Sequence, residues 1–140
     1  MMKYYIVSRK NPLNKSEKFY AQLQTQHVTD VTELTDKIVA RCTLTKPDVQ
    51  AAIAAFEEEV IAALLQGRSV KIGSLGCFRP SLASTGSMDK EGFTSKNIKR
   101  VKVRFTPSSI IRKTVQPGMP GVSFQLINPK TDEVVEEGGV

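Results

Sequence analysis

The sequence of 140 residues has no tryptophan, one histidine and two cysteines. A metal site or a histidine-based nucleophilic triad normally needs several ligands, or a base with its orienting partner, so a single His27 makes both hard to assemble. Cys42 and Cys77 have neither CxxC spacing nor the cysteine density of a secreted scaffold. We expect both thiols to be reduced, buried and structural, and His27 to be a surface residue.

Long apolar runs are also missing. No segment approaches the ~18 apolar residues of a membrane span, and the apolar part of MMKYYIVSRK is far too short for a signal peptide. The sequence therefore predicts a cytoplasmic protein. Its length suits one domain with ordered appendages. An apolar fraction of 40% with 6% aromatics predicts a core of small side chains, which often needs a partner chain.

Motifs of common nucleotide-dependent enzymes are absent from the sequence. The segment SLASTGSMDKEG lacks the GK[ST] of a phosphate loop, and no GxGxxG follows a predicted strand. Glu57, Glu58 and Glu59 are consecutive, so on a helix their carboxylates point in different directions rather than forming a pair. We predict no enzyme activity, no cofactor and no small-molecule substrate.

Positive charge is concentrated in the middle of the chain. Residues 67–115 hold eleven Lys or Arg against two acidic residues, a net +9, whereas residues 21–66 carry −4 and residues 116–140 carry −3. A uniformly solvated surface would mix its signs, so this separation favours a polyanion-binding face. Structural solubility is the alternative explanation.

The first part of the chain predicts a hairpin and then a helix. Two β-prone runs within residues 4–28 flank a turn-rich segment, which is typical of a β-hairpin. Apolar residues at intervals of three and four then predict an amphipathic helix over residues 30–43, with Thr29 or Asp30 as its N-cap.

A second helix has strong end signals. Thr45 can cap it, Pro47 fits its first turn, Asp48 stands in a capping-box-like position, and Gly67 is its natural stop. Its apolar stripe consists of Val49, Ile53, Phe56, Val60 and Leu64. Such a helix has more apolar surface to bury than one short neighbour can cover, which favours a dimer. The alternative is a monomer closed by the N-terminal hairpin.

Short strands follow this helix. GRSVKIGSLGCFRP, residues 67–80, sets glycines around brief strand-forming runs and predicts two sharp turns. Farther on, IKRVKVRFTP alternates, although Ile98 breaks the phase. One face holds Val101, Val103 and Phe105, and the other holds Arg100, Lys102 and Arg104. Three cations in register repel one another, so a partner with regularly spaced negative charge is expected.

The C-terminal part predicts a short helix and an extension. Thr106 and Pro107 are expected in its N-cap and first-turn positions. QPGMPG is a linker by composition, and VSFQLI predicts a strand before a turn at Asn128–Pro129 and an acidic tail.

The order of these elements resembles the HU and integration host factor family of histone-like bacterial DNA-binding proteins. The resemblance covers residues 29–115, where Gly67, Gly73, Gly76 and Phe78 occupy matching places and residues 105–115 look like the last strand and closing helix. It implies an α+β fold, an intertwined dimer with two N-terminal core helices, a three-stranded antiparallel saddle with a β-ribbon arm, and a short C-terminal helix.

The ends of the chain look like those of extended HU-like variants. On this view residues 1–28 form an N-terminal β-hairpin extension, residues 29–115 the DNA-binding domain, and residues 116–140 a C-terminal extension.

The resemblance also implies a partner, double-stranded DNA. Members are nucleoid-associated homodimers or heterodimers whose arms embrace the minor groove and bend DNA with little sequence preference. Cations there would neutralise phosphates or enter the groove. By position they are Arg79, Lys96, Lys99, Arg100, Lys102, Arg104, Arg112 and Lys113, with Lys71 on the saddle.

The arm departs from the family pattern at its tip. Residues 81–97 contain no proline and lack the Arg-Asn-Pro motif that wedges between base pairs. Met88 or Phe93 could serve as the apolar wedge, but Asp89 and Glu91 beside them would repel phosphates. The alternative function is a protein-interaction or assembly module that keeps the fold, uses its extensions as the binding surface and has weak or lost DNA binding.

Overall fold

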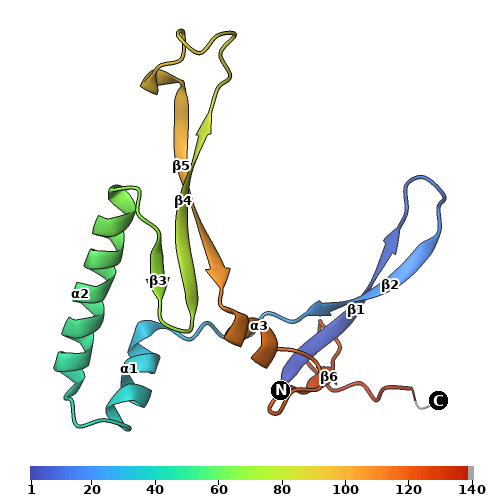
Figure 1. Cartoon of the computed structure of the whole chain (residues 1–140). Coiled ribbons are helices and arrows are strands. Elements are labelled where there is room, and N and C mark those ends of the chain that lie inside the picture. Colours follow the sequence, from blue (N-terminus) through green and yellow to red (C-terminus); the bar gives the residue numbers. More distant parts are fainter. Residues whose placement is uncertain (139–140) are drawn as a thin grey trace. The chain divides into compact units, whose positions relative to one another are not determined.

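A computed structural model describes residues 1–138 of the chain (Figure 1). The chain divides into two compact units. One unit contains Thr29–Lys113, and the other is built from both ends of the chain, Met1–Val28 with Thr114–Val140. The fold is mixed α+β, with three α-helices and two small sheets within the described residues.

The helix α1, Val31–Val39, is shorter than the sequence predicts. Asp30 caps it, and its side chain accepts a hydrogen bond of 2.9 Å from the backbone N–H of Glu33. Ala40 is the C-cap, with its N–H directed back to the carbonyl groups of the last turn. The predicted extension of this helix to residue 43 is therefore wrong, because the chain turns away before Thr45 begins the next helix.

The early end of α1 also changes the expected position of a cysteine. Cys42 lies beyond the helix and is exposed, whereas Cys77 lies in a strand and is half-buried. The expectation that both thiols are buried is thus wrong for Cys42, since the apolar period that included it does not continue as helix.

The helix α2, Lys46–Leu65, has the predicted ends. Thr45 and Asp48 form a reciprocal capping box. At the other end Gly67, at φ 73°, donates to Leu64, and Arg68 donates to Ala63. This pair of hydrogen bonds is a Schellman motif, which needs a residue that tolerates positive φ.

The capping box predicts a pH-dependent contribution to stability. Hydrogen bonds from the Thr45 hydroxyl and backbone N–H hold the pKa of the Asp48 carboxyl below its ordinary value of 3.8. Because the folded pKa is lowered, this stabilisation is present above pH 3.8 and is lost as the pH falls through the folded pKa. We expect the difference in Tm between the wild type and Asp48→Ala to be largest near neutral pH and to vanish in strong acid. A difference that stays constant down to that pH would contradict this role.

Three antiparallel strands complete this unit. They are β3 Val70–Ile72, β4 Gly76–Ser84 and β5 Ile98–Pro107, in the order β3-β4-β5. The tight β3–β4 turn uses Gly73 at φ 45°, a conformation that glycine adopts at little cost. The β4–β5 pair continues beyond β3 as a ribbon that projects away from the helices (Figure 1).

Gly76 pairs with Pro107 at the start of β4, where close packing leaves no room for a side chain. A Cβ atom here would meet the backbone oxygen of Thr106 and lie 2.7 Å from Cζ of Phe105. We expect Gly76→Ala to lower the free energy of unfolding by roughly 1–3 kcal/mol, the usual cost of overpacking. Gly86→Ala is the matched control, because a Cβ there meets nothing within 4 Å. Equal effects of the two changes in thermal melting would contradict the packing argument.

The last helix of this part, α3 Ser109–Thr114, starts later than predicted. Thr106 and Pro107 remain in β5, where they pair with Cys77 and Gly76, so the prediction that they begin the helix is wrong. Strand pairing outweighs the local helix-start pattern. Ser108 takes the cap position instead, since its Oγ accepts from the N–H of Ile111 at 3.2 Å.

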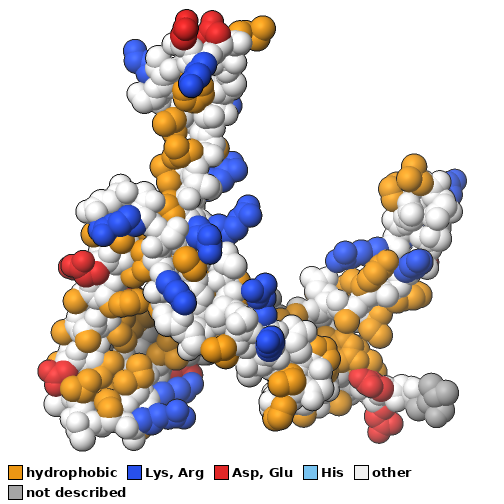
Figure 2. Space-filling view, in the orientation of Figure 1, with side chains coloured by type: hydrophobic (Ala, Val, Ile, Leu, Met, Phe, Trp, Pro, Cys, Tyr) orange, Lys and Arg blue, Asp and Glu red, His pale blue; other side chains and the backbone are white. Residues whose placement is uncertain are grey.

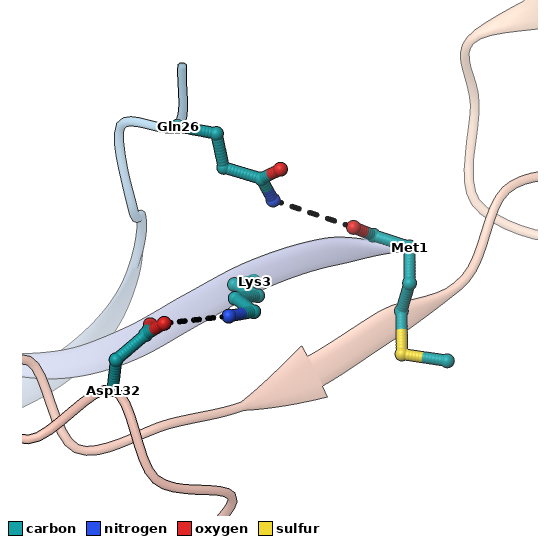
Figure 3. Close-up of polar contacts among 4 residues, drawn as sticks. All are labelled: Met1, Lys3, Gln26 and Asp132. Carbon is teal, nitrogen blue, oxygen red and sulfur yellow. Dashed lines mark hydrogen bonds and ion pairs between the residues drawn. The ribbon is translucent and has the colours of Figure 1, made fainter.

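The second unit is a sheet in the order β2-β1-β6. The strands β1 Met2–Lys10 and β2 Glu17–Leu23 form an antiparallel hairpin, and β6 Phe124–Leu126 pairs in parallel with β1. Figure 3 shows two contacts that hold this sheet: Lys3 to Asp132 at 2.7 Å, and Gln26 to the Met1 carbonyl at 3.4 Å. The two ends of the chain are therefore joined by both backbone pairing and side chains.

The core of a single chain is small. Within residues 1–138, the buried apolar side chains are Val49 and Ile127, at 4% and 2% exposure. The helices instead expose large apolar side chains, including Leu34, Phe56 and Ile61 at 47%, 50% and 57%. Exposed apolar surface of this extent on α1 and α2 is of the kind that often marks a protein-interaction site.

Candidate nucleic-acid interface

The strand register sorts the side chains of the β3-β4-β5 sheet onto two faces. Arg79 lies opposite Arg104, and Lys71 lies opposite Cys77, two residues before Arg79 on β4. Since opposed residues share a face and alternate residues along a strand share a face, five cations fall on one side. We call this side the basic face; its cations are Lys71, Arg79, Arg100, Lys102 and Arg104.

The charges of the basic face are not neutralised within the described chain. All five cations are exposed, and none of them has an acidic partner within 4.0 Å among residues 1–138. Arg79 is opposite Arg104, while Lys102 and Arg100 are opposite Ser81 and Ala83. Like charges directly opposite one another destabilise a strand pair. The face is therefore suited to a ligand that brings negative charge at regular intervals.

A β-bulge in β5 explains why Ile98 does not follow the alternation of the rest of the strand. Ala83 pairs with Arg100 and Ser84 pairs with Ile98, so Lys99 is an extra residue without a cross-strand partner. This insertion resets the alternation and accounts for the phase break at Ile98. Lys99 is exposed, as is Lys96 in the short 3₁₀ turn Ser95–Asn97 before β5. Both cations lie along the returning strand toward the tip of the ribbon.

The tip of the ribbon has its own internal hydrogen bonds. Asp89 Oδ1 accepts from the N–H of Gly92 at 2.6 Å, and Ser87 Oγ donates to the Asp89 carbonyl at 2.8 Å. The Asp89 carboxylate thus shapes the turn as well as carrying charge. Met88 is fully exposed at 104%, and Phe93 is 42% exposed. Figure 2 shows acidic side chains at this tip, and Lys and Arg side chains both near the tip and lower on the ribbon.

The start of α3 is tied to the same sheet. The N–H of Ser108 donates to the Leu75 carbonyl at 2.9 Å, and its hydroxyl donates to the Ser74 carbonyl. Arg112 and Lys113 follow in the last turn of this helix, both exposed. The two hydrogen bonds of Ser108 therefore anchor the helix that carries these two cations to the β3–β4 turn.

The opposite face of the ribbon is apolar. Phe78 opposes Phe105 with ring centroids 5.1 Å apart, and Pro80 opposes Val103. Toward the ribbon tip this face stays open, with Leu82 at 63% and Val101 at 60% exposure. Near the helices, Ile72 and Phe78 share a hollow with α2 side chains, among them Phe56 and Ile61. The ribbon thus has one cationic and one apolar side.

Within residues 1–138, no group of three His, Cys, Asp or Glu side chains is placed to hold a metal ion. In the same part of the chain, no helix has the length and apolar character needed to cross a membrane.

Comparisons with known proteins agree with this architecture. Residues 1–119 match the family model HU-HIG, described as an HU domain fused to wHTH, Ig, or glycine-rich motif. The chain belongs to this family. Because the match begins at residue 1, the HU-HIG assignment includes the N-terminal hairpin as well as the helices and the ribbon. The resemblance to HU-like proteins inferred from the element order is thereby confirmed.

Solved structures share the fold of this HU-HIG chain, and one of them covers most of its length. It comes from Bacteroides vulgatus ATCC 8482 and is described as a "Putative bacterial DNA binding protein". The TM-score is 0.56 at 22% sequence identity, with 80% of this chain and 44% of that chain covered. The chain thus spans less than half the length of that protein. No curated protein sequence matches the chain.

Proposed function

We propose that this HU-HIG chain is a nucleoid-associated architectural protein that binds double-stranded DNA with little sequence preference. The observation that carries the proposal is the basic face, whose exposed cations have no acidic partner among the described residues. Phosphates of a duplex are regularly spaced anions, and their neutralisation releases condensed counterions. Such binding gives affinity without reading the bases.

Each predicted cation has a role in this proposal. Arg79, Arg100, Lys102 and Arg104 would follow the duplex backbone along the ribbon, and Lys71 would extend this contact onto β3. The cations outside the regular face, Lys96, Lys99, Arg112 and Lys113, would add phosphate contacts near the ribbon tip and at α3. Met88 at the tip is the apolar side chain most available to unstack a base step, in place of the absent proline.

The proposal includes a dimer of this chain, homomeric or with a related partner. Support comes from the exposed apolar surface of α1 and α2, where Leu34, Phe56 and Ile61 are each 47% exposed or more. Complete burial of an exposed side chain of this type stabilises by roughly 1.5–3 kcal/mol, and about half of the side-chain surface of these residues is still exposed. A second copy offers the same apolar helices in a self-complementary arrangement, as closed dimers require.

A protein-assembly role is the second candidate. One face of the β2-β1-β6 sheet exposes Ile6, Phe19, Leu23 and Phe124, at 54%, 70%, 60% and 48%. Exposed apolar surface of this kind often marks a protein-binding site. This role predicts partner binding that is indifferent to the charges of the basic face.

The proposed function is tested by fluorescence anisotropy with a duplex of mid-range length and two scrambled versions of it. We expect the three Kd values to agree within about threefold, because phosphate contacts carry no sequence information. A preference of one duplex by two or more orders of magnitude, typical of specific readers, would contradict the sequence-tolerant function.

A further inference from the structure

A second group of cations gathers at the turn of the β1–β2 hairpin, in the unit that does not contain the basic face. Residues 9–18 carry four cations and one acid, Glu17. The cations are Arg9, Lys10, Lys15 and Lys18. All of these residues are exposed, and Figure 2 shows Lys and Arg side chains on this hairpin. We call this group the hairpin cations.

The strand register places like charges against each other here. Arg9 lies directly opposite Lys18, while Lys10 lies opposite Glu17. The Arg9 guanidinium lies over the ring of Tyr20, 5.4 Å from its centroid, an arrangement that orients a cation beside an aromatic surface. Directly opposed cations are destabilising, so the hairpin tip, like the basic face, has a charge pattern that an anion would relieve.

Three of these cations line one shallow hollow. Arg9, Lys10 and Lys18 surround it together with Asn11, Asn14, Ser16 and Tyr20. The side-chain oxygens of both asparagines are already used, accepting from the N–H of Leu13 at 2.9 Å and of Ser16 at 3.1 Å. Their side-chain NH₂ groups remain as donors. Cations and amide donors around one hollow are the groups that bind phosphate oxygens.

Lys15, the fourth of the hairpin cations, has an unfavourable backbone conformation in the turn. Lys15 has φ 54°, a left-handed conformation that asparagine and glycine adopt more readily. Its N–H donates to the Asn11 carbonyl at 2.9 Å, and the N–H of Asn11 donates to the Ser16 carbonyl at 2.9 Å. The closed turn therefore keeps a lysine where a neutral residue would fit the backbone better.

We propose that the hairpin cations form a second binding surface for the phosphate backbone of duplex DNA. The inference extends the proposed function to a second unit of the chain and rests on that function for the identity of the polyanion. A single chain would then contact DNA through both of its compact units. An anionic membrane would also attract these cations, but a hollow lined by amide donors fits discrete phosphate oxygens better than a diffuse charged surface.

The test uses the full chain with the ribbon already neutralised by Arg100→Gln, Lys102→Gln and Arg104→Gln. In this background we add Arg9→Gln, Lys10→Gln, Lys15→Asn and Lys18→Gln, with asparagine at position 15 because it tolerates positive φ. Residual duplex binding at low salt is expected to fall by at least about tenfold, since four phosphate contacts are removed. The matched control in the same background neutralises four other lysines, Lys3, Lys37, Lys46 and Lys130, and should change the affinity less than about twofold.

Two further measurements keep the result interpretable. The pair Lys15→Asn and Lys18→Gln retains the stacking of Arg9 on Tyr20, so weaker binding by this pair cannot come from disruption of that stacking; circular dichroism checks folding of each variant. Equal effects of the hairpin and control sets would overturn the inference. So would a hairpin set that abolishes binding to phosphatidylserine vesicles but leaves duplex binding unchanged. If instead ribbon neutralisation alone leaves the wild-type affinity intact, the proposed role of the basic face fails while the hairpin surface is still tested separately.

Discussion

Replacing Arg100, Lys102 and Arg104 with glutamine is expected to weaken duplex binding by roughly two to three orders of magnitude near physiological salt. The three side chains occupy one face of β5 and have no acidic partner within 4.0 Å among residues 1–138. The magnitude of the slope of log K against log salt should fall by about 0.9 for each DNA phosphate that the variant no longer neutralises. Anisotropy titrations at several salt concentrations measure both quantities.

The control for this variant neutralises three lysines that are already paired. Lys3, Lys37 and Lys46 lie 2.7, 2.8 and 2.6 Å from the carboxylates of Asp132, Glu33 and Asp36. Their replacement by glutamine removes the same formal charge but no unpaired cation. A loss of affinity equal to that of the ribbon variant would mean that overall charge, rather than the basic face, determines binding.

A carboxylate introduced at Phe56 is expected to disrupt the proposed dimer and to destabilise the chain severely. Phe56 is 50% exposed in the single chain and lines the hollow between α2 and the sheet. If a second copy covers this surface, Phe56→Glu places a charge in an apolar interface, where an unpaired charge is very costly. We expect light scattering to give the mass of a monomer, whether that monomer is folded or unfolded.

The dimer prediction has a control on the same helix. Gln50→Glu adds the same charge to α2 at another exposed position and should leave the mass and the Tm nearly unchanged. The Tm of the wild type should rise with protein concentration, as expected when folding is coupled to association. A wild type that is monomeric and equally stable at all concentrations would contradict the dimer.

The parts of the fold set by local interactions could be predicted from the sequence. The ends of α2 depend on residues within one turn of each end, and Thr45, Asp48 and Gly67 have the predicted roles. Local patterns failed where pairing with a distant strand competes. Thr106 and Pro107 look like a helix start, but their pairing with Cys77 and Gly76 keeps them in β5.

Features of the candidate site that depend on pairing between distant residues were harder to predict from the sequence. The alternation of Arg100, Lys102 and Arg104 is visible in the sequence, but the position of Lys71 on the same face depends on the β3–β4 register. The bulge at Lys99 had one local sign, the phase break at Ile98. The parallel pairing of β6 with β1 joins residues more than a hundred positions apart, and no periodicity indicates it. The grouping of the hairpin cations depends on the register of β1 and β2, which places Arg9 opposite Lys18.

The salt dependence of wild-type duplex binding tests the central claim most directly. Binding of the full chain to one duplex is measured by anisotropy from low to physiological salt, and log K is plotted against log salt. Phosphate neutralisation by the basic face predicts tight binding at low salt and a steep, linear negative slope equivalent to several phosphate contacts. A flat dependence, or no binding even at the lowest salt, would show that the basic face has a different partner.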